Sequence, residues 1–158
     1  MTPRAVKAYV EPTPLERLGY DQPAPDAYRL YFPWARNPLP ANDGHGHWRA
    51  RAAKEKSVRE ATELRILTAK VPHMDYLRAQ VTWWVNDRRI RDADNLGPIE
   101  KRMFDAIVRA GLIADDHPGL MDKPRGRIRH IGDAGDEAPV THACFVLTIT
   151  RLHEAPDA

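Results

Sequence analysis

Residues 76–86, YLRAQVTWWVN, alternate apolar and polar side chains more cleanly than any other stretch of the sequence. Successive side chains of a β-strand point to opposite faces of the sheet, so this alternation predicts a strand with one buried face. The apolar residues of that face are Leu77, Ala79, Val81, Trp83 and Val85. The strand is the most strongly specified element of the chain, and the other elements are assigned around it.

Two helices are expected on either side of this strand. Residues 49–70 contain neither Pro nor Gly, are rich in Ala, Arg, Lys and Glu, and end before Pro72. A second helix is expected over residues 98–110, because Pro98 suits a first helical turn and Gly111 a helix end. Its apolar face carries Ile99, Met103, Phe104, Ala106, Ile107 and Ala110.

The remaining segments complete a β-α-β-α-β-β order. Strands are expected over residues 27–32 and 140–152, with a broken strand over 120–131. The predicted fold class is α+β, a mixed sheet of about four strands with two helices packed on it. We expect one domain over residues 27–153 and a short tail over 154–158. Residues 1–26 are rich in proline, and we expect them to form an extended or poorly ordered extension.

Composition limits the class of protein. The chain has 158 residues, 42% hydrophobic and 29% charged, which suits one folded domain. No apolar run approaches the roughly 20 residues that a membrane span needs, and the N-terminus lacks a secretion signal. The one cysteine, Cys144, excludes an internal disulfide and a cysteine-based zinc site, and its apolar surroundings predict a buried, inert thiol. These features predict a cytoplasmic protein with no membrane partner.

Charge is distributed unevenly along the chain although the net charge is only +2. Residues 27–91 carry 13 Lys and Arg against 6 Asp and Glu, whereas residues 92–122 carry 3 against 7. Residues 123–129 are again basic. This acidic island between basic flanks is either a chance cluster of solvated charges or a metal-loaded carboxylate cluster within a surface that binds a polyanion.

Four carboxylates belong to this island: Asp92, Asp94, Asp115 and Asp116. Asp92 and Asp94 are two apart just after the strand, so an extended backbone sends both to the same side. Asp115 and Asp116 are adjacent, so only one of them should join the cluster fully. Three converging carboxylates suit Mg²⁺ or Mn²⁺, and two such ions can hydrolyse a phosphodiester. The alternative is that all four are solvated turn residues. An EF-hand is excluded because Leu96 occupies its fifth position.

The segments RRIRDADNL and KRMFDAIVRAGLIADDHPGLM resemble the RusA family of Holliday-junction resolvases. The resemblance covers about residues 28–152 and is most specific over residues 89–116. It implies that Asp92 and Asp94 are metal ligands and that Asp116 is the catalytic acid, with Asp115 as a helper. It also matches Lys101 to a catalytic lysine of the family, although about three extra residues precede it here. The alternative for Lys101 is a surface ion pair with Asp105.

The family resemblance further implies Mg²⁺, replaceable by Mn²⁺, with two ions per site, a homodimer, and four-way DNA junctions as substrate. Family members are frequently encoded by phages and prophages. Nine basic residues around the carboxylates are expected to contact DNA phosphates: Arg49, Arg51, Lys54, Arg88, Arg89, Arg91, Arg125, Arg127 and Arg129. For the first helix the alternative is a solvated face paired with Glu55, Glu60 and Glu63.

Three smaller features of the sequence bear on the candidate site. Trp83 and Trp84 should point oppositely, one into the core and the other toward a dimer interface or a stacked base. His45 and His47 could bind zinc but have no third ligand at suitable spacing, so a polar loop is favoured. No Gly-rich phosphate loop occurs, which argues against a nucleotide cofactor.

The sequence therefore predicts a metal-dependent endonuclease that resolves branched DNA. Two alternatives remain: a less selective metal-dependent nuclease or phosphatase, and a non-catalytic module that binds branched DNA.

Overall fold

The computed structural model describes residues 9–41 and 47–156. It has the α+β class expected from the sequence, with six strands rather than about four. The elements, in chain order, are α1 (Pro14–Leu18), β1 (Tyr20–Ala24), β2 (Ala27–Phe32), α2 (Trp48–Thr68), β3 (Tyr76–Val85), η1 (Ala93–Leu96), α3 (Gly97–Arg109), β4 (Met121–Asp122), β5 (Arg127–His130), α4 (Ile131–Ala134), η2 (Gly135–Glu137) and β6 (Cys144–Leu152).

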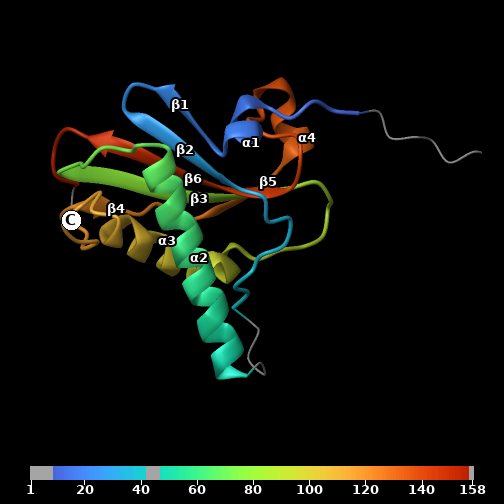
Figure 1. Cartoon of the computed structure of the whole chain (residues 1–158). Coiled ribbons are helices and arrows are strands. Elements are labelled where there is room, and N and C mark those ends of the chain that lie inside the picture. The colour runs from blue at the N-terminus through green and yellow to red at the C-terminus, as the bar shows by residue number, and fades with distance from the viewer. Residues whose placement is uncertain (1–8, 42–46, 157–158) are drawn as a thin grey trace, which may run out of the picture.

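The sheet runs in the order β1-β2-β6-β3-β4, and β5 also pairs with β3 (Figure 1). The first three pairings are antiparallel, and the pairings of β3 with β4 and β5 are parallel. β4 and β5 are the two halves of the expected broken strand, interrupted around Pro124, which has no backbone N–H for the ladder. The last strand begins at Cys144 rather than at residue 140.

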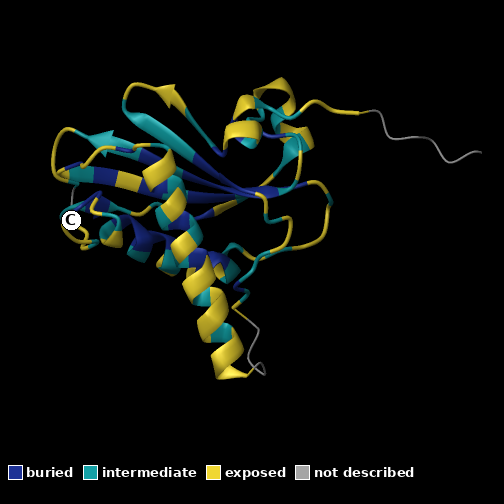
Figure 2. Cartoon of the chain, in the orientation of Figure 1, coloured by how far each residue is buried: buried dark blue, intermediate teal, exposed yellow. Residues whose placement is uncertain are grey.

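Helices α2 and α3 cover one face of the sheet, and the main core lies beneath them. The predicted apolar face of α3 is confirmed, because Ile99, Met103 and Ile107 are fully buried there. α2 buries only a narrow stripe, Val58, Thr62 and Ile66. Its N-terminal half projects beyond the body and is largely exposed (Figures 1 and 2).

The opposite face is only partly covered, by α1, α4 and their loops. A smaller core lies there, formed by Leu15, Tyr31, Trp84, Val140, Cys144 and Val146. Trp84 is thus the buried member of the tryptophan pair, and Cys144 is buried as predicted. Burial raises the pKa of the Cys144 thiol to about 12, so the thiol stays protonated and inert.

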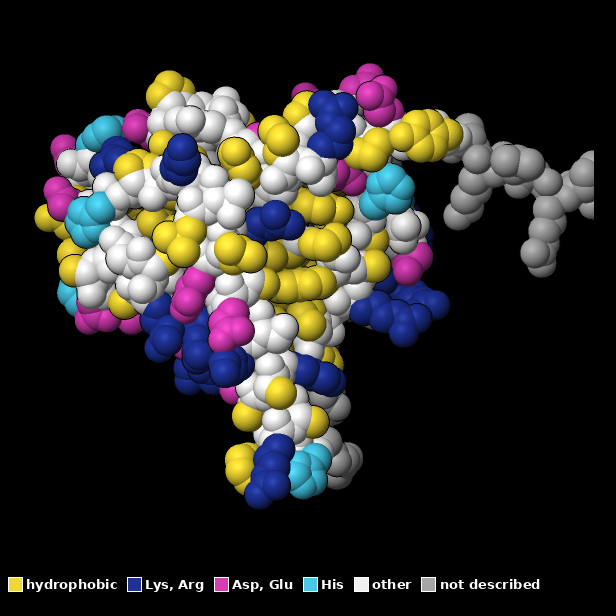
Figure 3. All heavy atoms as spheres, viewed as in Figure 1, with side chains coloured by type: hydrophobic (Ala, Val, Ile, Leu, Met, Phe, Trp, Pro, Cys, Tyr) yellow, Lys and Arg dark blue, Asp and Glu magenta, His cyan; other side chains and the backbone are white. Residues whose placement is uncertain are grey.

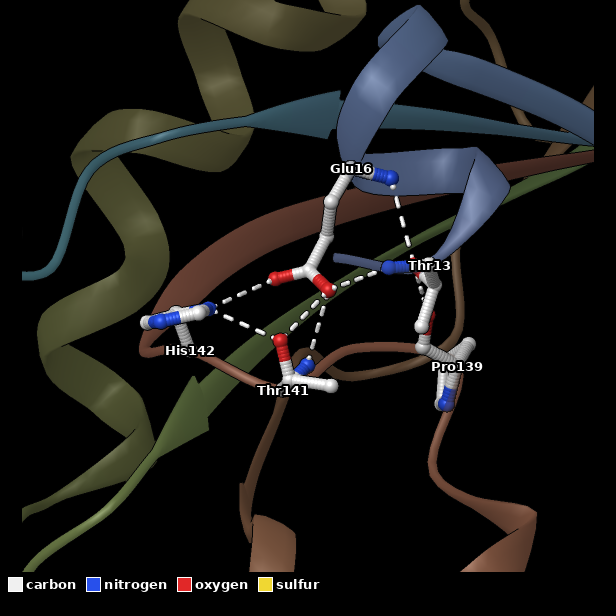
Figure 4. A network of polar contacts seen from close by, with 5 residues as sticks. All are labelled: Thr13, Glu16, Pro139, Thr141 and His142. Atoms are coloured by element: carbon white, nitrogen blue, oxygen red, sulfur yellow. Dashed lines mark hydrogen bonds and ion pairs between the residues drawn. The ribbon is translucent and has the colours of Figure 1, made fainter. Parts of the chain in front are cut away.

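Residues 13–24 are structured, so the predicted extended or poorly ordered extension is wrong there. The turn between α1 and β1 needs Gly19: its φ is +84°, and a Cβ would meet the guanidinium of Arg65. The Glu16 carboxylate, 4% exposed, accepts hydrogen bonds from the backbone N–H groups of Thr13 and Thr141 and from the Thr141 hydroxyl, and contacts His142 (Figure 4). This network ties α1 to the segment before β6.

No helix among the described residues is both long and apolar enough to cross a bilayer.

Candidate functional site

The candidate site begins where β3 ends. After residues 86–91 the chain turns into η1, and Asp92 caps this short helix, since its carboxylate accepts the N–H of Asp94 at 3.0 Å. The Asn37 side chain donates to the carbonyl of Asn95 at 3.1 Å and holds the turn against the segment after β2. Local turn chemistry therefore fixes Asp92 and Asp94 beside each other, although the backbone is not extended across both residues as the sequence suggested.

Arg125 lies against this pair of carboxylates. Its Nη2 atom is 2.6 Å from Oδ1 of Asp94 and 4.0 Å from Oδ1 of Asp92. All three side chains are about two-thirds or more exposed. The backbone of Arg125 is itself held, because the Gln80 side chain of β3 donates to its carbonyl at 2.8 Å. Two neighbouring carboxylates therefore share one exposed cation.

Glu100 is a third carboxylate near Arg125, and no sequence motif singled it out. It lies on the first turn of α3, half-buried, against the backbone of Gly126. Burial raises the pKa of Glu100 above its usual value of 4.5, although Arg125 and a hydrogen bond from the Gly126 backbone partly oppose this shift. The signal that could have identified Glu100 was its position on the first helical turn after the two aspartates.

Asp116 is placed near the same basic segment by a second ion pair. Its carboxylate lies 3.6 Å from the ammonium group of Lys123, two residues before Arg125. Lys123 also lies over the ring of Phe104. Asp115 and Asp116 line one hollow together, between α2 and α3, and Asp115 accepts the N–H of Asp116 at 2.7 Å. Both aspartates therefore face this hollow, and the expectation that only one of them joins Asp92 and Asp94 stays a prediction.

The carboxylates are not gathered into one metal cluster. Among residues 9–41 and 47–156, no three His, Cys, Asp or Glu side chains lie close enough together to hold a metal ion. Asp92 and Asp94 share Arg125, whereas Asp116 pairs with a different cation, Lys123. Lys101 is exposed on α3, and the ion pair considered for it is wrong, because Asp105 pairs with Arg102 at 3.1 Å instead.

The loop before Asp92 carries three arginines in different environments. Arg91 is the most enclosed: its guanidinium lies 5.0 Å from the Trp83 ring centroid and 2.8 Å from the Asp87 carboxylate. Arg88 is fixed by a two-pronged contact with Asp133 on α4. Arg89 points into solvent, with its nearest carboxylate oxygen 4.0 Å away on Asp87.

The arginines of β5 lie on the sheet face opposite α2 and α3. Arg127 and Arg129 pair with Thr82 and Trp84 of β3, and Arg129 lies over the Trp84 ring. Arg127 is exposed and has no ion partner among the described residues. With Arg29 of β2, they border a groove of about 290 Å³ on this open face.

The basic residues of α2 are largely paired along the helix, which is the alternative considered for them. Arg51 lies 3.4 Å from Glu55, Lys56 pairs with Glu60, and Arg59 with Glu63. Arg49 stacks on Trp48 at the projecting end, and Lys54 lies on the same exposed half and also has an interaction.

His47 caps α2, because its ring nitrogen accepts the N–H of Arg49. This supports the polar-loop interpretation, and His45 lies outside the described residues. No family model matches this sequence, and no curated protein is significantly similar to it.

Proposed function

We propose that this chain is a Mg²⁺-dependent endonuclease that cuts branched DNA, with the four-way junction as its leading substrate. The observation that carries the proposal is the arrangement after β3, where Asp92 and Asp94 lie beside each other and face one shared cation, Arg125. The resemblance of residues 89–116 to the RusA family supplies the substrate class. The exposed Arg89 and Arg127, which come before and after the carboxylates along the chain, support it, because solvent-facing cations suit a polyanion.

Asp92 and Asp94 have the chemistry to hold Mg²⁺, or Mn²⁺ in its place, because both offer exposed carboxylate oxygens and already share a positive group. Asp116, which pairs with Lys123, would be the third ligand, with two ions as the expected complement. Bound metal would polarise the scissile phosphate and activate water.

The chain's own basic residues have separate tasks in this proposal. Arg125 and Lys123 neutralise the carboxylates while no other cation is present, which limits the repulsion between like charges. Once released, they are placed to contact a phosphate. Arg91, held between Trp83 and Asp87, would position a phosphate next to Asp92. Lys101 is exposed on α3, with no ion partner in residues 9–41 and 47–156, and would reach the negative charge that develops at the scissile phosphate.

A homodimer follows from the proposed substrate. A four-way junction has two-fold symmetry and needs two opposed cuts, whereas each chain carries one candidate site, so two chains related by a two-fold axis meet the requirement. A DNA substrate also implies a cytoplasmic location.

A second candidate function is a non-catalytic module that binds branched DNA. It is favoured by one observation: the three proposed ligands are neutralised by Arg125 and Lys123, and they do not form a three-ligand cluster within the described residues.

The two candidates are separated by incubating the purified protein with matched four-way, flap and linear duplexes, with and without Mg²⁺. The endonuclease proposal predicts paired cuts in the junction that require Mg²⁺. Junction binding without cleavage would favour the non-catalytic module, and equal cleavage of all three DNAs would favour an unselective nuclease.

A further inference from the structure

A hollow of about 540 Å³ lies next to the candidate site, on the sheet face that carries α2. We call it the Trp83 hollow; its lining includes Ala35, Arg36, Trp83, Arg89, Ile90 and Arg91. Its volume falls within the range of about 300–1,000 Å³ that small-molecule sites occupy. Figure 3 shows hydrophobic side chains gathered on this face beside α2, with Lys and Arg side chains nearby.

The apolar part of the hollow is built from planar groups that are already fixed. Trp83 stacks on Phe145, with ring centroids 5.2 Å apart and 14° between the planes, and Arg91 lies over the Trp83 ring. The indole N–H of Trp83 donates to the carbonyl of Ala35 at 3.2 Å, which joins β3 to the segment after β2. Unpaired bases stack on aromatic rings and on guanidinium planes, and a prearranged surface lowers the entropic cost of binding them.

The rim of the hollow carries surplus positive charge. Arg36 is exposed and has no ion partner in the described part of the chain, and Arg89 is 81% exposed. Asp87 is the one acidic residue in the described lining. Its carboxylate accepts the backbone N–H of Arg89 at 3.0 Å and lies 2.8 Å from the Arg91 guanidinium, whereas the Arg89 guanidinium is 4.0 Å away. The guanidiniums of Arg36 and Arg89 can therefore contact phosphate groups.

The hollow is continuous with the candidate site through the chain itself. Arg91, which lies over Trp83, is followed directly by Asp92. The hollow and the carboxylates are therefore close enough for one DNA to contact both. A nucleotide in the hollow would come from the strand whose phosphate lies at Asp92 and Asp94, or from the strand next to it. Bases at a branch point are the ones most easily unstacked and unpaired, since they lack a continuous neighbour.

We propose that the Trp83 hollow binds one unpaired nucleotide at the branch point, with its base stacked on the outer side of the Arg91 guanidinium and against the edge of Trp83, and with its phosphates against Arg36 and Arg89. This inference rests on the proposed function and deepens it, because it assigns the recognition of branched DNA to a particular site. Protein partners are the weaker fit: Ile90 is fully exposed, but interface centres are depleted of charge, and this rim has two solvent-facing arginines.

The test measures binding of a hexathymidylate in EDTA, where metal-dependent cleavage cannot occur, by fluorescence anisotropy. Arg36→Gln and Arg89→Gln should each weaken binding about fivefold, a typical effect of one lost phosphate contact. The control is Arg17→Gln on α1, which removes the same charge outside the hollow and should change binding less than twofold. A second probe is a four-way junction with 2-aminopurine at the branch point, whose fluorescence should be quenched by wild type and less by Arg36→Gln.

Unchanged binding in both hollow variants, or an equal loss in Arg17→Gln, would overturn the inference. A second result would also overturn the inference. If Ile90→Ser changes the oligomeric state of the protein, while the arginine variants bind hexathymidylate as wild type does, the hollow is a protein interface. Cleavage of the junction in Mg²⁺ is measured in parallel. If the protein cleaves the junction but does not bind hexathymidylate, only the proposed nucleotide site is rejected. If it binds hexathymidylate in the hollow but does not cleave the junction, the proposed endonuclease function is rejected and the nucleotide site is supported.

Discussion

Replacement of Arg125 by Gln should tighten Mg²⁺ binding, because Arg125 occupies the position that a metal ion between Asp92 and Asp94 would need. Two unit charges about 4 Å apart in water interact by about 1 kcal/mol, so a divalent ion would experience about 2 kcal/mol of repulsion from the guanidinium. Screening at 0.15 M ionic strength reduces this to roughly 1 kcal/mol. The dissociation constant should therefore fall about fivefold.

The assay is a titration of the DNA-free protein with Mn²⁺, followed by electron paramagnetic resonance of the free ion, and with Mg²⁺ by calorimetry. Arg127→Gln is the matched control, since Arg127 lies two residues further along and has no ion partner in the described residues. The affinity of the Arg127→Gln variant for metal should stay within about threefold of wild type, because the greater distance between Arg127 and the metal, together with screening by salt, weakens the repulsion. Equal or weaker metal binding by Arg125→Gln would refute the idea that Asp92 and Asp94 form a cation site.

Three further predictions concern single carboxylates. Glu16→Gln should lower the free energy of unfolding by about 2 kcal/mol at pH 7, measured with urea, because it weakens the hydrogen bonds of a buried carboxylate. Burial alone would raise the pKa of Glu16. The hydrogen bonds from Thr13, Thr141 and His142 together lower it by more than burial raises it, so the pKa of Glu16 lies below its usual value of 4.5. Its contribution should therefore be full above pH 4.5 and disappear as the pH falls through the folded-state pKa; identical acid unfolding of wild type and variant would contradict this. For Glu100→Gln the sign is opposite: the raised pKa means that the ionised form costs stability, so the variant should equal or exceed wild type at pH 7 in the same assay, with the advantage disappearing toward pH 4. Asp116→Asn should reduce junction cleavage more than Asp115→Asn, because Asp116 pairs with the 123–125 segment whereas Asp115 contacts its neighbour's backbone; the reverse order of cleavage rates would exchange their roles.

The elements with a strong local pattern were predictable from the sequence. β3 follows from strict alternation, and α3 follows from one apolar face between Pro98 and Gly111. α2 was assigned from composition, because only Val58, Thr62 and Ile66 are buried and this narrow stripe gives little periodicity.

The N-terminal segment was misjudged because its proline content suggested an extended chain. Its order depends on contacts distant in sequence, above all those between Glu16 and Thr141, which no local pattern reveals. Pro14 stands in the first turn of α1, where its missing N–H costs nothing.

That Asp92 and Asp94 lie beside each other after β3 was predictable from the sequence, but the short helix that brings them together and the cation that they share were not. The partner of Asp94 lies 31 residues further along the chain, and the basic character of residues 123–129 gave no indication of which cation would approach which carboxylate. Asp105 shows the same limit, since spacing allowed it to pair with either Lys101 or Arg102, and tertiary packing selected Arg102.

The central claim is that Asp92 and Asp94 hold the cation that makes this chain an endonuclease. Its most direct test is the rate of four-way junction cleavage by wild type and Asp94→Asn across a Mg²⁺ titration. The claim predicts Mg²⁺-dependent cleavage by wild type and a loss of at least about 10³-fold in the variant, with junction binding retained. Cleavage by Asp94→Asn at the wild-type rate, or wild-type cleavage that does not depend on Mg²⁺, would contradict it.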